Sequence, residues 1–196
     1  MVKKIVGTGV LLVLALALQA GVKMYTLKSP DGKVKLEVTA GQGIAYSLFY
    51  DGRLLLKPSR IALHTDLPEA DHWENIRITG TKQRHVSETV QAPFYRVKEF
   101  GIDCNELELR LNNGFSLLMR AYNDGMAYRF VAGRKGEMTV VEERAEFNFA
   151  DDFEAYIPYS TNPKDPWNMA FQNFYTKAPL TQYNTELPAF LPLTVD

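Results

Sequence analysis

The sequence RAYNDGMAYRF, residues 120–130, decides the fold, because it places tight-turn residues between two segments of alternating side chains. Asn-Asp-Gly at 123–125 is typical of a hairpin turn, since Asn and Gly adopt a positive φ at low cost. Apolar side chains recur at every second position on both sides of this turn, at Phe115, Leu117 and Met119 and then at Met126, Tyr128 and Phe130. We therefore expect an antiparallel hairpin with one buried face and with Gly125 at a positive-φ position.

Two arginines, Arg120 and Arg129, fall on the opposite face of this hairpin. Charged side chains usually lie on a solvated face, and on a sheet edge they oppose aggregation between sheets. The simplest interpretation of both residues is therefore a solvated edge charge.

The rest of the chain up to residue 160 repeats this β pattern. Turn signals recur at short intervals, and no long stripe of apolar residues has the helical period. Strands are predicted at residues 24–28, 33–40, 45–50, 53–57, 76–82, 85–90, 94–100, 105–111, 115–122, 126–131, 138–149 and 154–158. Many short strands between frequent turns predict an all-β fold, a large antiparallel β-sandwich.

The first 20 residues have the order of a secretory signal peptide. Lys3 and Lys4 precede an apolar run from Ile5 to Leu18, and Ala20 supplies a small residue for cleavage. The run is too short for a membrane span, so we expect a secreted protein, periplasmic in a Gram-negative bacterium, whose mature domain covers residues 21–196. Without Lys3 and Lys4, 20 basic residues face 23 acidic ones, a balance that gives no reason to expect nucleic acid or an anionic membrane as partner.

The single cysteine, Cys104, cannot form an internal disulfide. No positive charge or histidine lies near it in the sequence to lower the pKa of its thiol, so a half-buried, unreactive residue beside a strand is expected. The mature chain must therefore be stabilised by an apolar core.

The composition changes after residue 160. Five of the ten prolines lie in the last 34 residues, together with several aromatic residues. Proline opposes central strands because it lacks a backbone donor. We expect an irregular C-terminal segment that packs either on the sandwich or on a partner.

The other groups of polar residues are better explained by solvent exposure or structural roles than by metal binding or catalysis. The spacing of His64, His72 and His85 matches no zinc motif. Four acidic residues surround His72 in a predicted loop without the pattern of an EF-hand, so a solvated acidic loop is expected there. No Gly-x-Ser-x-Gly motif indicates a serine nucleophile, and residues 142–146 are interpreted as the solvent-exposed face of a strand.

Five segments, in order, resemble the N-terminal domain of glycoside hydrolase family 97: residues 25–36, 46–52, 105–111, 120–130 and 142–147. The resemblance implies a β-sandwich of the galactose-mutarotase-like kind. It also implies an enzyme that acts on α-glucosides or α-galactosides, with a catalytic (β/α)₈ barrel following in the same polypeptide.

That barrel would hold the two carboxyl groups that glycoside hydrolysis requires. No scaffold for such a pair is visible in residues 1–196. We therefore expect an N-terminal non-catalytic domain, inactive alone, cut before the barrel. The alternative is a free-standing periplasmic carbohydrate-binding β-sandwich without catalysis.

The resemblance also implies a calcium ion near the active site, with an acidic ligand from the C-terminal segment of the sandwich domain. At that position this chain has Gln172, whose amide oxygen brings no charge, and Glu186 is the fallback ligand. Trp167 is the candidate that would offer a ring face to a sugar. For all three, packing on the sandwich remains the alternative interpretation.

Overall fold

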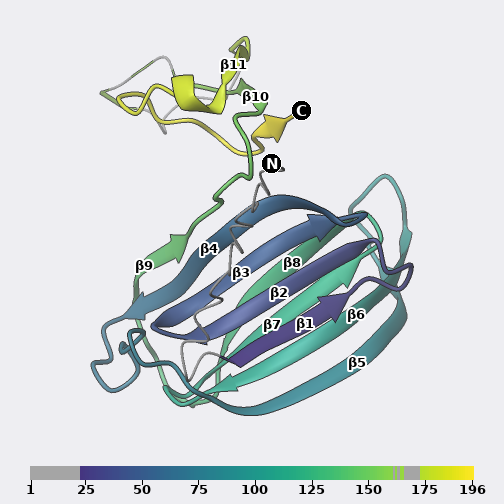
Figure 1. Ribbon diagram of the computed structural model, residues 1–196, viewed down its shortest axis with the longest axis vertical. Coiled ribbons are helices and arrows are strands. Elements are labelled where there is room, and N and C mark those ends of the chain that lie inside the picture. The colour runs from purple at the N-terminus through teal and green to yellow at the C-terminus, as the bar shows by residue number, and fades with distance from the viewer. Residues whose placement is uncertain (1–22, 161, 163, 166–172) are drawn as a thin grey trace, which may run out of the picture.

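A computed structural model describes residues 23–160, 162, 164–165 and 173–196 of the chain, so the predicted signal peptide lies outside the described residues. Two antiparallel sheets pack face to face, and a small third sheet stands beyond one end of them (Figure 1). Within the described ranges the only helix is the 3₁₀ turn η1 (Leu180–Gln182). None of the described helices is long and apolar enough to cross a membrane. The predicted all-β sandwich is confirmed.

The first sheet has five strands in the order β1-β2-β3-β4-β9. Its strands are β1 (Lys23–Lys28), β2 (Val34–Gly41), β3 (Gly43–Tyr50), β4 (Arg53–Thr65) and β9 (Val140–Ala145). Along β2, Val34, Leu36 and Val38 are buried while the residues between them are half-exposed, as the alternation predicts.

The second sheet has four strands in the order β5-β6-β7-β8 and lies behind the first in Figure 1. Its strands are β5 (Ile78–Gln91), β6 (Glu99–Leu111), β7 (Phe115–Tyr122) and β8 (Gly125–Ala132). The predicted hairpin is β7 and β8, which pair without interruption from Tyr122 and Gly125 to Phe115 and Ala132. Its apolar face is turned toward the first sheet.

One core joins the two sheets. Leu36, Val38, Ile44 and Ile61 of the first sheet and Leu107, Leu109, Leu117 and Met119 of the second are each 0–1% exposed. Trp73, in the loop between β4 and β5, closes one end of this core, with its ring 5.3 Å from that of Phe130. Burial of these side chains is the main stabilising contribution, because apolar area leaves water.

Two long strands replace four predicted ones. Residues 83–84 and 101–104 were expected to interrupt the β structure, yet β5 runs through 83–84 to Gln91 and β6 runs from Glu99 through 101–104. The strand predicted at 94–100 is wrong for residues 94–98, which lie in the loop between β5 and β6. Their polar and small side chains break the apolar pattern but not the backbone ladder, which pairs Ile78 to Gln91 with Leu111 to Glu99. Pairing with a neighbour overrides a weak local preference.

Strand β4 is also longer than predicted, because it passes through Pro58. The register between β3 and β4 shifts on both sides of Leu48, whose partner is Leu56, before Tyr46 pairs with Ser59. Pro58 therefore lies in an irregularity, where its missing N–H does not interrupt the ladder.

The expected positive φ at Gly125 is wrong. The connection between β7 and β8 is Asn123-Asp124, and Gly125 is the first residue of β8. Among the described residues the positive-φ positions are Gly32, Gly43, Gly52, Gly114 and Gly136 together with Asp51. The turn from β7 to β8 thus forms without a left-handed residue.

The C-terminal segment forms a small sheet of its own, with β10 (Glu154–Ile157) between β11 (Thr176–Pro179) and β12 (Thr194–Val195). We call residues 154–196 the C-terminal module. The strand predicted at residues 154–158 is confirmed as β10, but its assignment to the sandwich is wrong, because its described partners, β11 and β12, belong to this module. Ala155 and Ile157 form its small apolar centre, and both are fully buried.

Candidate functional site

The three residues predicted from the sequence are not brought together by the described structure. Trp167 and Gln172 lie outside the described residues. Glu186 follows η1 in the C-terminal module, is exposed, and its backbone N–H donates to Asn184 Oδ1 at 2.9 Å. Within the described ranges no three His, Cys, Asp or Glu side chains lie close enough to hold a metal. One carboxylate falls short of the six to eight oxygen ligands that calcium takes, so calcium binding stays a prediction.

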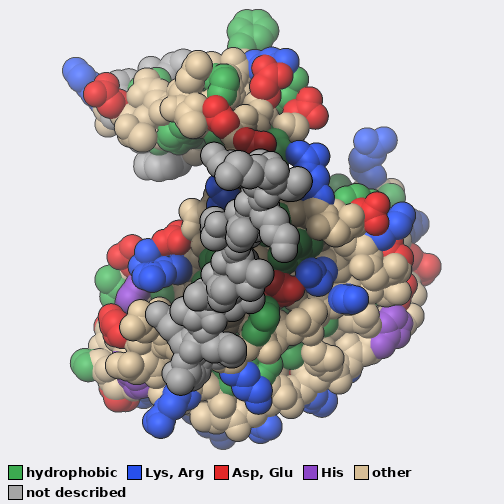
Figure 2. Space-filling model, in the orientation of Figure 1, with side chains coloured by type: hydrophobic (Ala, Val, Ile, Leu, Met, Phe, Trp, Pro, Cys, Tyr) green, Lys and Arg blue, Asp and Glu red, His purple; other side chains and the backbone are tan. Residues whose placement is uncertain are grey.

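A groove of about 890 Å³ lies between the sandwich and the C-terminal module. Figure 2 shows the molecule indented between these two parts. The sandwich contributes Lys57 and Pro58, the linking segment contributes residues 147–152, and the module contributes Leu180, Thr181 and Tyr183. The groove exists because the chain leaves β9 and crosses to β10 along the end of the sandwich.

The aromatic rings of Phe147, Phe149 and Tyr183 line this groove, and Phe153 packs against Phe149. Phe147 is 56% exposed and Tyr183 is 37% exposed. Phe149 and Phe153 form an edge-to-face pair with ring centres 6.2 Å apart, and the guanidinium of Arg53 lies 5.6 Å from the ring of Phe153. Large apolar side chains at this exposure, gathered in one hollow, are typical of a surface that binds something.

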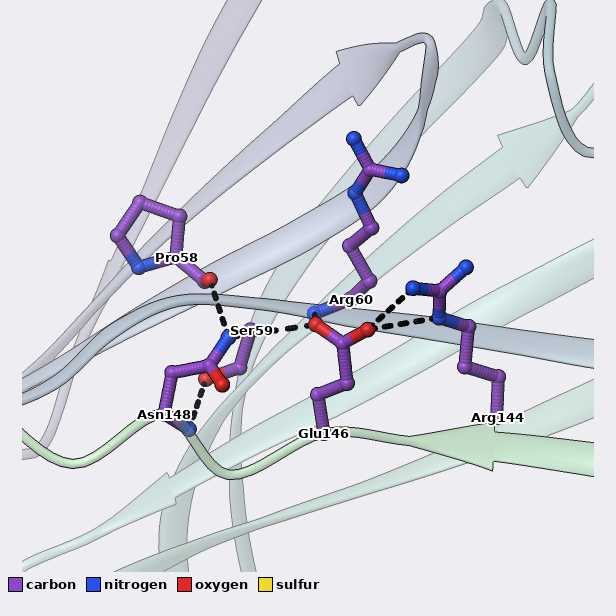
Figure 3. Close-up of polar contacts among 6 residues, drawn as sticks. All are labelled: Pro58, Ser59, Arg60, Arg144, Glu146 and Asn148. Atoms are coloured by element: carbon purple, nitrogen blue, oxygen red, sulfur yellow. Dashed lines mark hydrogen bonds and ion pairs between the residues drawn. The ribbon is translucent and has the colours of Figure 1, made fainter.

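A network of polar contacts fastens the linking segment to β4 (Figure 3). The Glu146 carboxylate accepts hydrogen bonds from the backbone N–H of Arg60 at 3.0 Å and from Arg144 Nε at 2.8 Å. Asn148 Nδ2 donates to the carbonyl of Pro58 at 2.9 Å and to Glu146 at 3.2 Å. Ser59, fully buried, accepts the backbone N–H of Asn148 at 2.9 Å.

These contacts also set the charge of Glu146. The N–H of Arg60 and the guanidinium of Arg144 hold the pKa of the Glu146 carboxyl below its usual value. Because the carboxylate and its donors come from both β4 and the β9 strand and its extension, the network fixes the direction in which the chain leaves the sandwich. Residues 142–146 were interpreted as solvent-exposed; this is confirmed for residues 142–145, whereas Glu146 is half-buried and accepts structural hydrogen bonds.

The acidic residues of the groove, Asp151 and Asp152, both accept hydrogen bonds from neighbouring residues. Asp152 accepts from the N–H of Thr181 at 2.9 Å and from its hydroxyl at 2.8 Å, which ties the module to the link. Asp151 accepts the N–H of Asp152 at 2.9 Å. Glycoside hydrolysis needs two carboxyl groups that face each other across a bound sugar. Adjacent residues that satisfy backbone donors do not provide that arrangement.

A second polar centre, which sequence reasoning missed, is Glu106 on the outer face of the second sheet. Its side chain is 5% exposed, and its two oxygens accept from Arg84 Nε at 2.7 Å and from Arg120 Nε at 2.8 Å. Burial raises the pKa of Glu106, but the two guanidiniums outweigh it, and the net shift is downward. The expectation that Arg120 is a solvated edge charge is therefore wrong, since it pairs with a buried carboxylate from β6.

The remaining candidate side chains are either paired with neighbouring residues or buried. His64 Nδ1 lies 2.7 Å from Asp71 Oδ1, and His85 Nε2 lies 3.0 Å from Asp103 Oδ1, so both of these histidines are paired with a carboxylate. Cys104 is fully buried. In the acidic loop, Asp66 accepts the N–H of Thr139 and Glu69 pairs with Arg134.

The chain matches a known protein family over most of its length. Residues 27–196 match the family described as Glycosyl-hydrolase 97 N-terminal. The chain is 39% identical over 187 residues to the retaining alpha-galactosidase of Bacteroides thetaiotaomicron, covering 92% of this chain and 28% of that protein. It is 26% identical over 158 residues to a probable retaining alpha-galactosidase of Streptomyces bingchenggensis, covering 79% of this chain and 24% of that protein.

Solved structures share the fold. A glycoside hydrolase family 97 enzyme from a Pseudoalteromonas species, in complex with panose, superposes with a TM-score of 0.65 at 18% identity, covering 81% of this chain and 25% of that one. A beta-arabinopyranosidase gives a TM-score of 0.66 at 22% identity, covering 78% and 26%. The chain thus spans about a quarter of the length of the proteins that it matches.

Proposed function

Because the chain belongs to the Glycosyl-hydrolase 97 N-terminal family, we propose that it serves as the non-catalytic N-terminal domain of a secreted glycoside hydrolase. One observation carries this proposal: a relative that is 39% identical matches nearly the whole chain but only 28% of its own length. The remainder of such a protein has room for a separate catalytic domain, a (β/α)₈ barrel in this family. The described carboxylates of the groove accept hydrogen bonds from backbone N–H groups, which supports a non-catalytic role for this domain.

The substrate class follows from the same relatives. Both curated proteins are named as retaining alpha-galactosidases, whereas the structures in complex with panose or acarbose are 18% identical. We therefore favour α-galactosides over α-glucosides as the substrate of the complete enzyme. The carboxylates that cleave the bond belong to the catalytic barrel.

The groove beneath the C-terminal module supports a contact with that barrel. Phe147 and Tyr183 expose large apolar surface there, and ordering a proline-rich segment costs entropy that an apolar partner offsets. The module would then help to shape the active site from outside. A free-standing carbohydrate-binding sandwich is the less favoured candidate, because both curated relatives that match most of this chain are much longer than it and are named as enzymes.

Secretion and two ligand roles belong to the same proposal. The order of charged, apolar and small residues in positions 1–20 supports export, and the first residue of the mature protein, expected near Gly21, can be determined by N-terminal sequencing. Trp167 would contact sugar. Gln172 and Glu186 would supply oxygen ligands for calcium in the complete enzyme. Metal analysis of that enzyme with and without Glu186→Ala tests the calcium role.

The experiment that tests the main proposal compares two polypeptides. Residues 21–196 alone and the product of the complete reading frame are purified from a host without α-galactosidase, and each is assayed with p-nitrophenyl α-galactoside and α-glucoside. We expect turnover only from the longer product. Turnover by residues 21–196 would overturn the non-catalytic role, and a longer product that cleaves neither compound would overturn the enzyme assignment.

A further inference from the structure

The two sheets of the sandwich end in four edge strands, and three of them carry features that block pairing with another strand. Strand β1 has lysine at both ends. Strand β5 carries several charges and a register shift near Gly80. Strand β9 contains Glu142, Glu143 and Arg144 and a register shift opposite His64 and Thr65. Charges and bulges of this kind are how natural proteins protect sheet edges.

Strand β8 lacks this protection. It has eight residues, Arg129 is its single charged one, and its register with β7 runs without a shift over its whole length. A long, regular and mainly apolar edge is a template for a further strand. It differs in this respect from β9, the neighbouring edge of the other sheet.

The direction of the β8 backbone groups follows from one hydrogen bond. Just beyond the strand, the N–H of Gly133 donates to the carbonyl of Gly114 at 2.9 Å. In an antiparallel pair, hydrogen-bonded and non-hydrogen-bonded positions alternate. The backbone groups of Val131 and Arg129 therefore face β7, whereas those of Ala132, Phe130, Tyr128 and Met126 face away from it. Within the described part of the chain no hydrogen bond satisfies these outward groups.

The side chains at this edge are also only partly covered. Met126, Tyr128 and Phe130 pack against the core but are half-exposed. In the described part of the chain, one hydrogen bond joins these three side chains to the first sheet: the Tyr128 hydroxyl donates to Glu143 at 3.1 Å. On the opposite flank, two side chains of the second sheet bond to the β1 backbone, Gln83 to Thr26 at 3.1 Å and Asn105 to Lys28 at 2.9 Å. The β8 flank is therefore the more open one.

We propose that the outer edge of β8 pairs with an additional β-strand contributed by the same polypeptide, from the part that its relatives have and residues 1–196 do not contain. This rests on the proposed function, which requires such a part, and the 28% coverage of the related alpha-galactosidase leaves ample chain to supply it. The incoming strand would satisfy the outward groups of Met126, Tyr128, Phe130 and Ala132. Its inward side chains would cover the half-exposed rings of Tyr128 and Phe130.

Amide hydrogen exchange on the complete polypeptide tests this pairing. We expect the amides of Met126, Tyr128 and Phe130 to exchange at least about tenfold more slowly than in residues 21–196, reaching the protection of Ala127 and Arg129. The edge strand β5 is the internal control and should not change. Outward β8 amides that remain fast in the complete polypeptide would overturn the proposal. Protection that varies with protein concentration would also overturn it, since the occupant would then be a second copy.

Two proline variants make the test independent of overall stability. Ala132→Pro removes an outward N–H, so it should leave the denaturation midpoint of residues 21–196 unchanged and lower that of the complete polypeptide. Val131→Pro removes an N–H that faces β7 and should lower both midpoints. An unchanged midpoint of the complete polypeptide with Ala132→Pro contradicts the pairing. Absence of glycosidase activity alongside protected β8 amides would count against the proposed function and not against this pairing.

Discussion

Glu106 on β6 and Arg120 on β7 are direct partners across the second sheet, and the guanidinium Nε of Arg120 lies 2.8 Å from a carboxylate oxygen of Glu106 that is almost inaccessible to water. Arg84 on β5 binds the other oxygen. A buried carboxylate between two guanidiniums links three strands by their side chains as well as by their ladders. It also depends on its donors, because an unpaired buried charge is costly.

Arg120→Met should therefore destabilise the domain by about 2 kcal/mol, less than the loss of an entire buried pair because Arg84 remains. Urea denaturation measures the change. Arg129→Met is the matched control: it removes an exposed arginine from the same face of the adjacent strand and should change the free energy of unfolding by less than about 0.5 kcal/mol. Equal effects of the two substitutions would show that Glu106 does not need Arg120.

The pH dependence of stability should report the same carboxylate. The pKa of Glu106 is lowered in the folded protein, so the unfolded state binds its proton more readily, and stability rises with pH through this range. The stability difference between the parent chain and Glu106→Gln should be full above the unfolded pKa of about 4.3 and should shrink as pH falls through the folded pKa. A difference that grows on acidification would mean that the pKa is raised instead.

Glu146 should control how firmly the linking segment lies on β4. Glu146→Gln weakens charge-assisted hydrogen bonds from Arg60 and Arg144 and should cost about 1–2 kcal/mol. It should also accelerate protease cleavage between residues 147 and 153. Glu142→Gln, at an exposed position of the preceding strand β9, is the control and should alter neither property. Faster cleavage in both variants would point to a general loss of stability in β9.

Glycine substitutions should have different effects on stability at the β3–β4 turn, which contains Gly52, and at the β7–β8 turn, which is followed by Gly125. Gly52 has φ +80°, so Gly52→Ala strains the backbone and should cost about 1 kcal/mol. Gly125 has no positive φ, and nothing lies within 4 Å of an added Cβ. Gly125→Ala should therefore leave the denaturation midpoint unchanged or raise it slightly, because it restricts the unfolded chain. A loss at Gly125 as large as that at Gly52 would contradict the turn geometry.

Limited proteolysis should divide the chain at the groove. The exposed residues 181–186 have few ladder contacts, whereas the sandwich strands are paired along their length. We expect the first cuts between residues 160 and 187 and a resistant fragment that contains the sandwich. First cuts within residues 105–130 would mean that the β7–β8 hairpin is not central to the fold.

The alternation of apolar residues was enough to predict most strands, the β7–β8 hairpin and the all-β class, because the two-residue period of a strand depends on which neighbouring side chains are buried. The Glycosyl-hydrolase 97 N-terminal family was likewise predicted from ordered local segments. The lengths of the strands were harder to predict from the sequence. Residues 101–104 lack an apolar pattern and are extended only because β5 pairs with them.

Tertiary structure alone decided the remaining features. Glu106 and Arg120 are 14 positions apart, and only the register between β6 and β7 makes them partners. Arg60 and Glu146 meet across 86 positions, and β10 leaves the sandwich although its sequence resembles the other strands. Local sequence specifies the conformation of a segment through its own side chains. Which edge it pairs with, and which charge it meets, depend on distant segments that bury or satisfy it.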